Sequence, residues 1–105
     1  MCIRDRDYAN LSGAKLIGAN LSKANLYGSN FNGVNLTGAD LSYANLSGVD
    51  LGYSNLSEAN LTGANLSGAD LSYTNLIGTN LSETNLTGAI LCNTETPWGI
   101  EYSGC

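Results

Sequence analysis

From residue 9 to residue 93 the chain repeats every five residues without an insertion, and no other feature limits its fold so strongly. Sixteen of the seventeen units have Leu at the central position, and Phe31 occupies the centre of the remaining unit. The residue two positions before the centre is always Ala, Ser, Thr or Val. Asn or Asp precedes the centre in fifteen units, with Lys15 and Ile90 as the exceptions, and Gly fills the last position in ten. Every unit therefore offers one apolar and one small side chain at fixed positions.

A period of five fits neither an α-helix nor a straight strand. On a helix, five residues advance by about 500°, so successive leucines would lie roughly 140° apart and form no apolar stripe. On a strand, side chains alternate between faces, so successive leucines would point to opposite sides. All the centres can point inward only if the chain turns a corner in each unit, and four corners close a square coil. Gly suits such corners because it has no Cβ, and Asn suits them because it forms local hydrogen bonds.

The repeat resembles the pentapeptide repeat family, whose pattern is A(D/N)LXX, over 85 of the 105 residues. Residues 9–13, for example, read Ala-Asn-Leu-Ser-Gly. The resemblance implies an all-β fold, a right-handed quadrilateral β-helix whose coils stack through parallel backbone hydrogen bonds. Seventeen units give about four coils. We expect the central residues of the middle coils, such as Leu36, Leu56 and Leu76, to be buried together with the small residues two positions before them.

The two ends of the chain lack the repeat. Residues 1–6 resemble a translated sequencing adapter, so residues 1–8 are interpreted as a non-native leader and entry segment, and the alternative is a genuine short N-terminus. On this interpretation the chain is a fragment, and its true N-terminus, any upstream domain or signal peptide, and its source are open. Residues 94–105 contain the chain's single Pro and single Trp and are expected to form a C-terminal cap over the repeat of residues 9–93. Within this cap, Trp98 or Ile100 is expected to cover the apolar end of the coil.

Two cysteines, Cys92 and Cys105, bracket the predicted cap. A disulfide between them would join the cap to the last coil and would favour an exported, periplasm-like location. The alternative is a pair of free thiols in a cytosolic protein, and the compartment stays open. The stretch from Cys92 also resembles a cap found in some bacterial pentapeptide repeat proteins.

The residue types present argue against catalysis and metal binding. The chain has no His, so no His-based acid–base pair or His metal site can form, and the two cysteines outside the adapter-like leader, which holds Cys2, are too few for a zinc site. Ser and Thr are abundant, but no His or buried Lys is expected to activate them. We therefore predict no catalytic, cofactor or metal site. Nine Asn-X-Ser/Thr sequences follow from the repeat itself and are not interpreted as glycosylation sites.

A twenty-residue coil places residues twenty apart in one column. Asp50 and Asp70 then stack on adjacent coils, as do Tyr53 and Tyr73, and these four residues are the predicted interaction surface. The alternative interpretation is ordinary solubilising charge together with cross-coil aromatic stacking that only stabilises the rod. Three Thr side chains that point inward, Thr74, Thr79 and Thr84, are expected to donate hydrogen bonds to backbone carbonyls.

These observations favour a non-catalytic bacterial scaffold that binds an unidentified protein through its flat sides. The alternative function is a DNA mimic that binds and protects DNA gyrase, as the resemblance implies for some members of the family. Against it, the repeat units hold five acidic residues and two lysines, far below the charge density of duplex DNA. Nucleic acid is not an expected partner, the oligomeric state is open, and no apolar run reaches the length of a membrane span.

Overall fold

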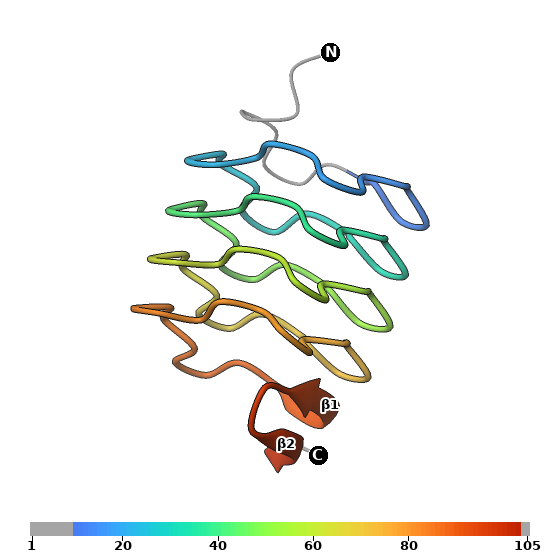
Figure 1. Cartoon of the computed structure of the whole chain (residues 1–105), viewed down its shortest axis with the longest axis vertical. Coiled ribbons are helices and arrows are strands. Elements are labelled where there is room, and N and C mark those ends of the chain that lie inside the picture. The colour runs from blue at the N-terminus through green and yellow to red at the C-terminus, as the bar shows by residue number, and fades with distance from the viewer. Residues whose placement is uncertain (1–9, 104–105) are drawn as a thin grey trace.

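The computed structural model describes residues 10–103 and shows a right-handed, four-sided β-helix closed at one end by a β-hairpin (Figure 1). Its extents are 36 × 25 × 21 Å. The adapter-like leader and Cys105 lie outside the described residues. Parallel bridges join residues twenty apart along the chain, from Asn10↔Asn30 to Asn75↔Glu95. The expected period of twenty residues per coil is confirmed.

The backbone of an interior unit satisfies each of its five amides. Taking residues 34–38 as an example, the Asn35 amide donates to the coil before it, and the Leu36 and Gly38 amides donate to the coil after it. The first amide, that of Val34, closes a turn onto the carbonyl of Phe31. The amide of Thr37 has no partner in a neighbouring coil and donates instead to Asn35 Oδ1, at 3.1 Å. The side-chain oxygen of the Asn before the centre therefore accepts a hydrogen bond from the one amide that has no acceptor in a neighbouring coil.

Each corner is a β-turn whose second central residue has a positive φ, the geometry of a type II turn. Gly occupies this last position of the unit in ten cases, with φ between 66° and 73°. The other seven corners hold residues with side chains at φ of 56–61°: Lys23, Tyr43, Tyr53, Glu58, Tyr73, Glu83 and Asn93. In every unit, including that of Asn93, the positive φ falls on the last residue and not on the residue before the centre, so the Asn and Asp residues before the centres serve the corner through their side-chain oxygens.

The core is a column of side chains that fills the coil. Leu36, Leu56 and Leu76 have no exposed surface, and Phe31 is equally enclosed. The small residues two positions earlier are buried beside them, so the predicted register is confirmed in the middle coils. The first and last coils pack against this core but stay partly exposed, because each lacks a covering coil on at least part of one side.

The three inward-pointing Thr hydroxyls donate hydrogen bonds to backbone carbonyls, as the sequence predicts. Thr74, Thr79 and Thr84 each donate to the carbonyl of a Leu twenty-three residues earlier, at 2.7–2.8 Å. Thr94 repeats this bond to Leu71 one coil later. The hydroxyls therefore tie the last coil to the coil before it and β1 to the last coil, and no buried side-chain polar atom is left unpaired in the described part of the chain.

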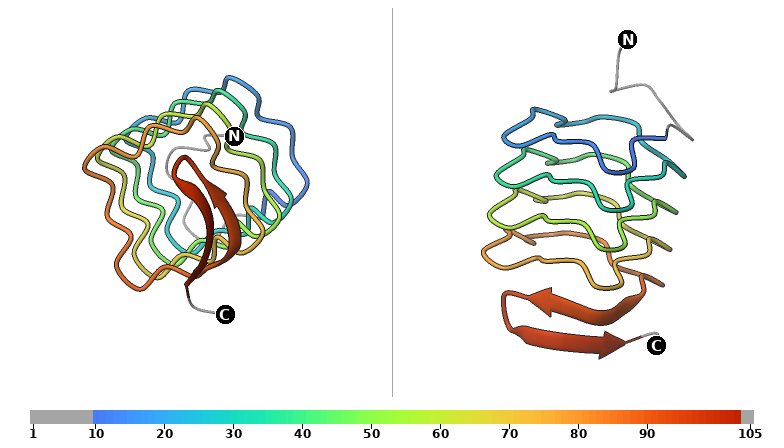
Figure 2. Two further views of the ribbon diagram at one scale, coloured as in Figure 1. Left: turned by 60° about the horizontal axis from the view of Figure 1, so that its bottom comes forward. Right: turned by 90° about the vertical axis from the view of Figure 1, so that its right-hand side faces the viewer.

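The hairpin consists of β1 (Leu91–Thr96) and β2 (Gly99–Ser103). Strand β1 continues the five-residue register, with Thr94 and Thr96 buried at the small and central positions. One edge of β1 stacks on residues 71–76, and its other edge pairs with β2 in antiparallel fashion. Figure 2 shows β2 beyond β1 along the rod axis, at the far end of the stack.

The expectation that Trp98 or Ile100 covers the apolar end is wrong. Trp98 is 60% exposed and Ile100 is 56% exposed. The reason is register: Ile100 pairs with Glu95, which faces solvent, so both side chains lie on the outer face of the hairpin. Trp98 occupies the corner position of the continued repeat, which faces outward in the other units. Leu91, Thr94 and Thr96 of β1 are the residues that cover the coil.

Candidate interaction surface

Two carboxylates occupy one column on adjacent coils, as the sequence predicts. Asp50 and Asp70 form a parallel bridge, and both precede the centre of their unit. Asp50 Oδ1 accepts the amide of Gly52 at 2.9 Å. Asp70 Oδ1 accepts both the amide and the hydroxyl of Ser72, at 2.9 and 2.6 Å. In each case the local turn fixes the carboxylate through one oxygen.

Two tyrosines stack at the corner that follows these carboxylates. The ring centroids of Tyr53 and Tyr73 are 4.9 Å apart and their planes differ by 4°. Both rings are largely exposed, at 65% and 51%. Both residues have a φ of 59°, so a backbone held by coil–coil hydrogen bonds presents the pair to solvent. We call Asp50, Tyr53, Asp70 and Tyr73 the Tyr–Asp surface.

The Tyr–Asp surface offers two chemistries side by side. The tyrosine pair supplies flat aromatic area that is already ordered before a partner arrives. The carboxylates supply charge for an Arg or Lys, and the exposed rings can also receive a cation on their faces. The other two tyrosines of the repeat, Tyr27 and Tyr43, lie on other columns and are 43% and 60% exposed.

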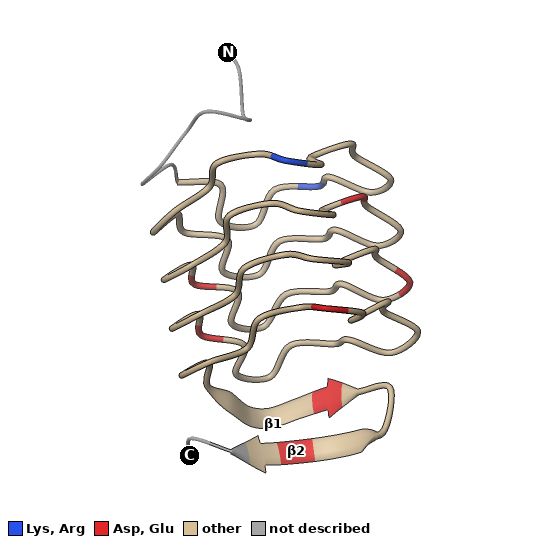
Figure 3. Ribbon diagram, turned by 90° about the vertical axis from the view of Figure 1, so that its left-hand side faces the viewer, with Lys and Arg blue, Asp and Glu red and all other residues tan. Residues whose placement is uncertain are grey.

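Charge is distributed unevenly along the rod. Figure 3 shows both lysines of the described residues, Lys15 and Lys23, in the first coil, and acidic residues in the later coils and the hairpin. A third Asp, Asp40, lies on a different column from the Tyr–Asp surface. Its pKa is lowered by a hydrogen bond from the Ser42 hydroxyl and by a second from the Ser42 amide. Because both lysines are in the first coil, the coils that carry the Tyr–Asp surface contain no lysine.

The described residues contain no group of three or more metal-ligating side chains. Asp50 and Asp70 are partly exposed on an outward column, where water screens them. Within residues 10–103 there is also no helix that a lipid bilayer could accommodate from end to end.

Cys92 is disulfide-bonded. Its expected partner, Cys105, lies outside the described residues, so the pairing stays a prediction, and export with it. The strand register is consistent with the pairing, because Leu91 pairs with Ser103 and Cys105 follows Ser103 by only two residues.

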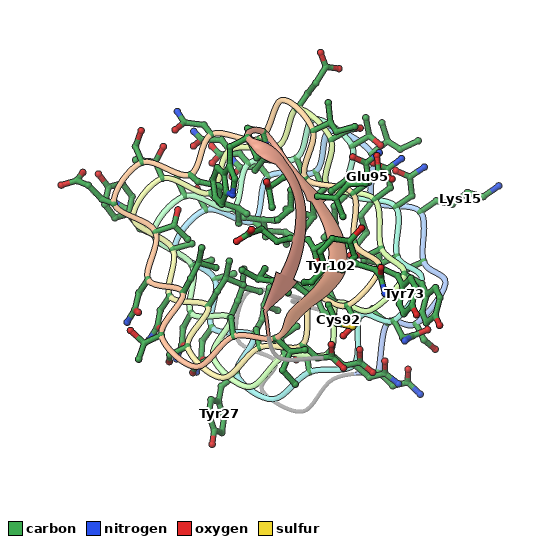
Figure 4. The ribbon with its side chains drawn as sticks, turned by 90° about the horizontal axis from the view of Figure 1, so that it is seen from below. Lys15, Tyr27, Tyr73, Cys92, Glu95 and Tyr102 are labelled. Atoms are coloured by element: carbon green, nitrogen blue, oxygen red, sulfur yellow. The ribbon has the colours of Figure 1, made fainter. Side chains whose placement is uncertain are left out.

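Sequence reasoning missed a second exposed surface, on the outer face of the hairpin. It consists of Trp98, Ile100 and Tyr102, which are 60%, 56% and 61% exposed. Figure 4 shows Tyr102 near Cys92, with Tyr73 of the Tyr–Asp surface on the same side of the rod. In the structure the five-residue register continues through residues 94–98, with Thr96 at the centre and Trp98 at the corner, but the sequence there lacks the central Leu that would signal it.

The family model named Pentapeptide repeats matches the chain in eight copies over residues 7–42, 39–76 and 69–95. Among curated proteins, none matches the sequence. Solved structures that resemble it include a pentapeptide repeat protein, Rfr23, from the cyanobacterium Cyanothece 51142. It is 44% identical with a TM-score of 0.80, and the match covers 81% of this chain and 58% of Rfr23.

A second structure, alr5209 from Nostoc Pcc 7120, is also a pentapeptide repeat protein. It is 37% identical with a TM-score of 0.56, and the match covers 79% of this chain and 64% of alr5209. The chain thus spans about three fifths of the length of these relatives. A trypsin-treated variant of QnrB1, a plasmid-mediated fluoroquinolone resistance protein, is 22% identical with a TM-score of 0.46 over 95% of this chain and 62% of its own. That likeness is too weak to carry an argument about function.

Proposed function

This chain belongs to the pentapeptide repeat family, whose proteins are generally non-catalytic structural repeat proteins, and we propose on that premise that it is a protein-binding scaffold. Its binding site is the Tyr–Asp surface. The observation that carries the proposal is the parallel Tyr53–Tyr73 stack, more than half exposed on a backbone that hydrogen bonds hold in place. An aromatic pair that is ordered before binding loses little conformational freedom when a partner covers it.

The charge next to the rings indicates the partner's chemistry. Asp50 and Asp70 lie in coils that contain no Lys or Arg. A partner segment with an exposed Arg or Lys would pair with these carboxylates, and its guanidinium or ammonium could rest on a tyrosine ring. The proposed partner is therefore a protein surface with basic residues.

Selection from a library of displayed protein fragments tests the proposal, with the whole chain as bait. We expect the selected fragments to carry Arg or Lys and to bind the Tyr53→Ala/Tyr73→Ala variant at least tenfold more weakly, because aromatic anchors dominate such interfaces. Tyr27→Ala is the matched control, since it removes an exposed ring from another column. Fragments that bind all three proteins equally would place the binding elsewhere.

A DNA mimic that protects gyrase remains the alternative, and the charge of the described rod argues against it. The coils hold Asp40, Asp50, Glu58, Asp70 and Glu83 against two lysines. Duplex DNA would present on the order of twelve charges over four coils. A gyrase supercoiling assay with and without a fluoroquinolone separates the two functions, and protection of the enzyme by this chain would favour the alternative.

A further inference from the structure

The backbone hydrogen bonds that stack the coils end at β1, and β2 is the last strand beyond it. The amides of Leu71, Tyr73 and Leu76 donate to residues 90–95, so β1 is paired on its coil side, and β2 pairs with its opposite edge. Among the described residues no strand pairs with the outer edge of β2. An unpaired edge of this kind is a template for another strand unless charge or Pro blocks it.

As an edge, strand β2 is protected by its five-residue length, by Glu101 and by the register shift between Cys92 and Thr94 of its neighbour, and not by Lys or Pro. Its outer face carries Ile100 and Tyr102, both more than half exposed, and Trp98 lies in the turn that precedes it. Neither Lys nor Pro occurs within the strand, because Pro97 lies in the turn. Apart from Glu95, the outer face of the hairpin is therefore apolar, and no described strand pairs with the edge beside it.

The charge of the hairpin is acidic. Glu101 is the middle residue of β2, and Glu95 pairs with Ile100 from β1. The nearest Lys along the described chain is Lys23, in the first coil at the opposite end of the rod (Figure 3). A partner that runs beside β2 would gain most from apolar residues next to Ile100 and Tyr102 and from a basic residue next to Glu101.

We propose that β2 binds an extended segment of a partner protein, in which apolar and basic residues alternate, by adding it as a further strand. Strand addition draws its affinity from backbone hydrogen bonds and its specificity from alternate side chains. The alternation matches β2, whose residues 100 and 102 face outward while Glu101 lies on the face of Thr94. This site is separate from the Tyr–Asp surface and does not depend on the function proposed for it.

A second copy of this chain is a poorer occupant. Full antiparallel pairing of two β2 strands centres on Glu101, so each copy would place this carboxylate directly opposite its equivalent. Like charges at directly opposed positions destabilise strand pairs.

The end of the last coil is a less suitable docking edge than β2. It also has amides with no partner among the described residues, such as those of Leu81 and Leu86. A corner interrupts this edge every five residues, whereas β2 is a continuous strand of five residues.

Chemical-shift titration of the full-length, ¹⁵N-labelled chain tests the proposal. The probe is a blocked heptapeptide in which valine and arginine alternate. We expect saturable shifts at residues 99–103 and slowed amide exchange in β2. The same peptide with glutamate in place of arginine should bind more weakly, and a version with alternate N-methylated amides should not bind, because it cannot pair with the strand edge.

Two variants with the same change in net charge isolate Glu101. Glu101→Lys should weaken binding of the arginine peptide by about fivefold and strengthen that of the glutamate peptide, as expected for one cross-strand charge pair. Glu83→Lys is the control, because Lys23 already occupies the equivalent corner in its column; it should leave both affinities unchanged. Ile100→Thr keeps a strand-forming residue while removing apolar area and should also weaken binding.

The following results would overturn the proposal. One is equal binding of the N-methylated peptide, which would exclude strand pairing. Another is a set of shifts confined to the Tyr–Asp surface, or no saturable shift at all. The third is concentration-dependent self-association with shifts in β2, which would make a second copy the occupant.

Discussion

At the scale of the residue, each position in the five-residue unit has its own task. The position before the centre holds Asn or Asp because a side-chain oxygen there accepts the amide two residues later, as Asn60 Oδ1 does for Thr62 at 3.0 Å. The sequence pattern predicts which residues face inward, because the alternation of apolar and polar types shows it directly. It does not show which amide lacks a partner, since that depends on the hydrogen bonds between coils.

Asn60→Ala should destabilise the protein by about 1 kcal/mol, because the amide of Thr62 loses its only acceptor. Asn60→Asp is the matched control, since Asp50 and Asp70 accept the same bond in their own units. Urea unfolding of both variants at neutral pH measures the difference. Equal stability of Asn60→Ala and the parent chain would mean that water satisfies the amide equally well.

Two glycines at equivalent corners should respond differently to replacement by Ala. Gly63 and Gly68 have φ of 66° and 68°, so Ala strains the backbone similarly at both. A Cβ at Gly63 would lie 2.5 Å from Cε1 of Tyr43, whereas a Cβ at Gly68 would meet nothing within 4 Å. Gly63→Ala should therefore be more destabilising than Gly68→Ala, by about 1 kcal/mol, because the exposed Tyr43 ring must move to another rotamer.

Thermal or urea unfolding of the two Ala variants provides the comparison. Adding Tyr43→Ala to Gly63→Ala should remove most of the extra cost, because the clashing ring is gone. If the two glycine variants unfold together, the ring of Tyr43 does not lie over Gly63.

Asp40 should make stability depend on acid pH. Its pKa is lower in the folded chain because the Ser42 hydroxyl and amide both donate to Oδ1, at 2.7 and 3.0 Å. The stabilisation is therefore complete above the unfolded pKa of about 3.9 and is lost as the pH falls through the folded value. Asp40→Asn keeps an acceptor oxygen and cannot titrate, so it should lose less stability between pH 6 and pH 2. Parallel losses in the two proteins would contradict this.

At the scale of the element, the coil and the hairpin differ in how far the sequence predicts them. The coil can be predicted from the repeat, because every unit buries the same two positions, the centre and the small residue two positions before it. The hairpin is predicted to be a cap, but the sequence does not show that β1 keeps the five-residue register through Thr96 or that the pairing of Ile100 with Glu95 turns Ile100 outward. That pairing is a contact between segments, and no local pattern records it.

The coils should contribute unequally to stability. Leu56 lies in the interior of the stack with no exposed surface, whereas Leu86 lies in the last coil and is partly exposed. Leu56→Ala should cost about 2–5 kcal/mol because it leaves a cavity, and Leu86→Ala should cost clearly less. Urea unfolding followed by circular dichroism measures both. Equal losses would indicate that the hairpin end is covered as completely as the middle.

At the scale of the whole molecule, the rod has two exposed surfaces that contribute nothing to its core. The Tyr–Asp surface could be located from the sequence, because residues twenty apart share a column once the period is known. The outer face of the hairpin could not, because its exposure depends on strand pairing. Both surfaces combine acidic side chains with exposed aromatic or aliphatic side chains. Both also lie outside the first coil, which holds Lys15 and Lys23.

The central claim is that one register decides which side chains face outward, from the first coil through the turn of the hairpin. Trp98 tests it most directly, because it is the only Trp in the chain and occupies the last corner. We expect its fluorescence in the folded chain to be quenched by acrylamide nearly as strongly as in urea, while circular dichroism shows an intact β-helix. Strong protection from acrylamide in the folded chain would mean that Trp98 covers the end of the coil and that the register stops before it.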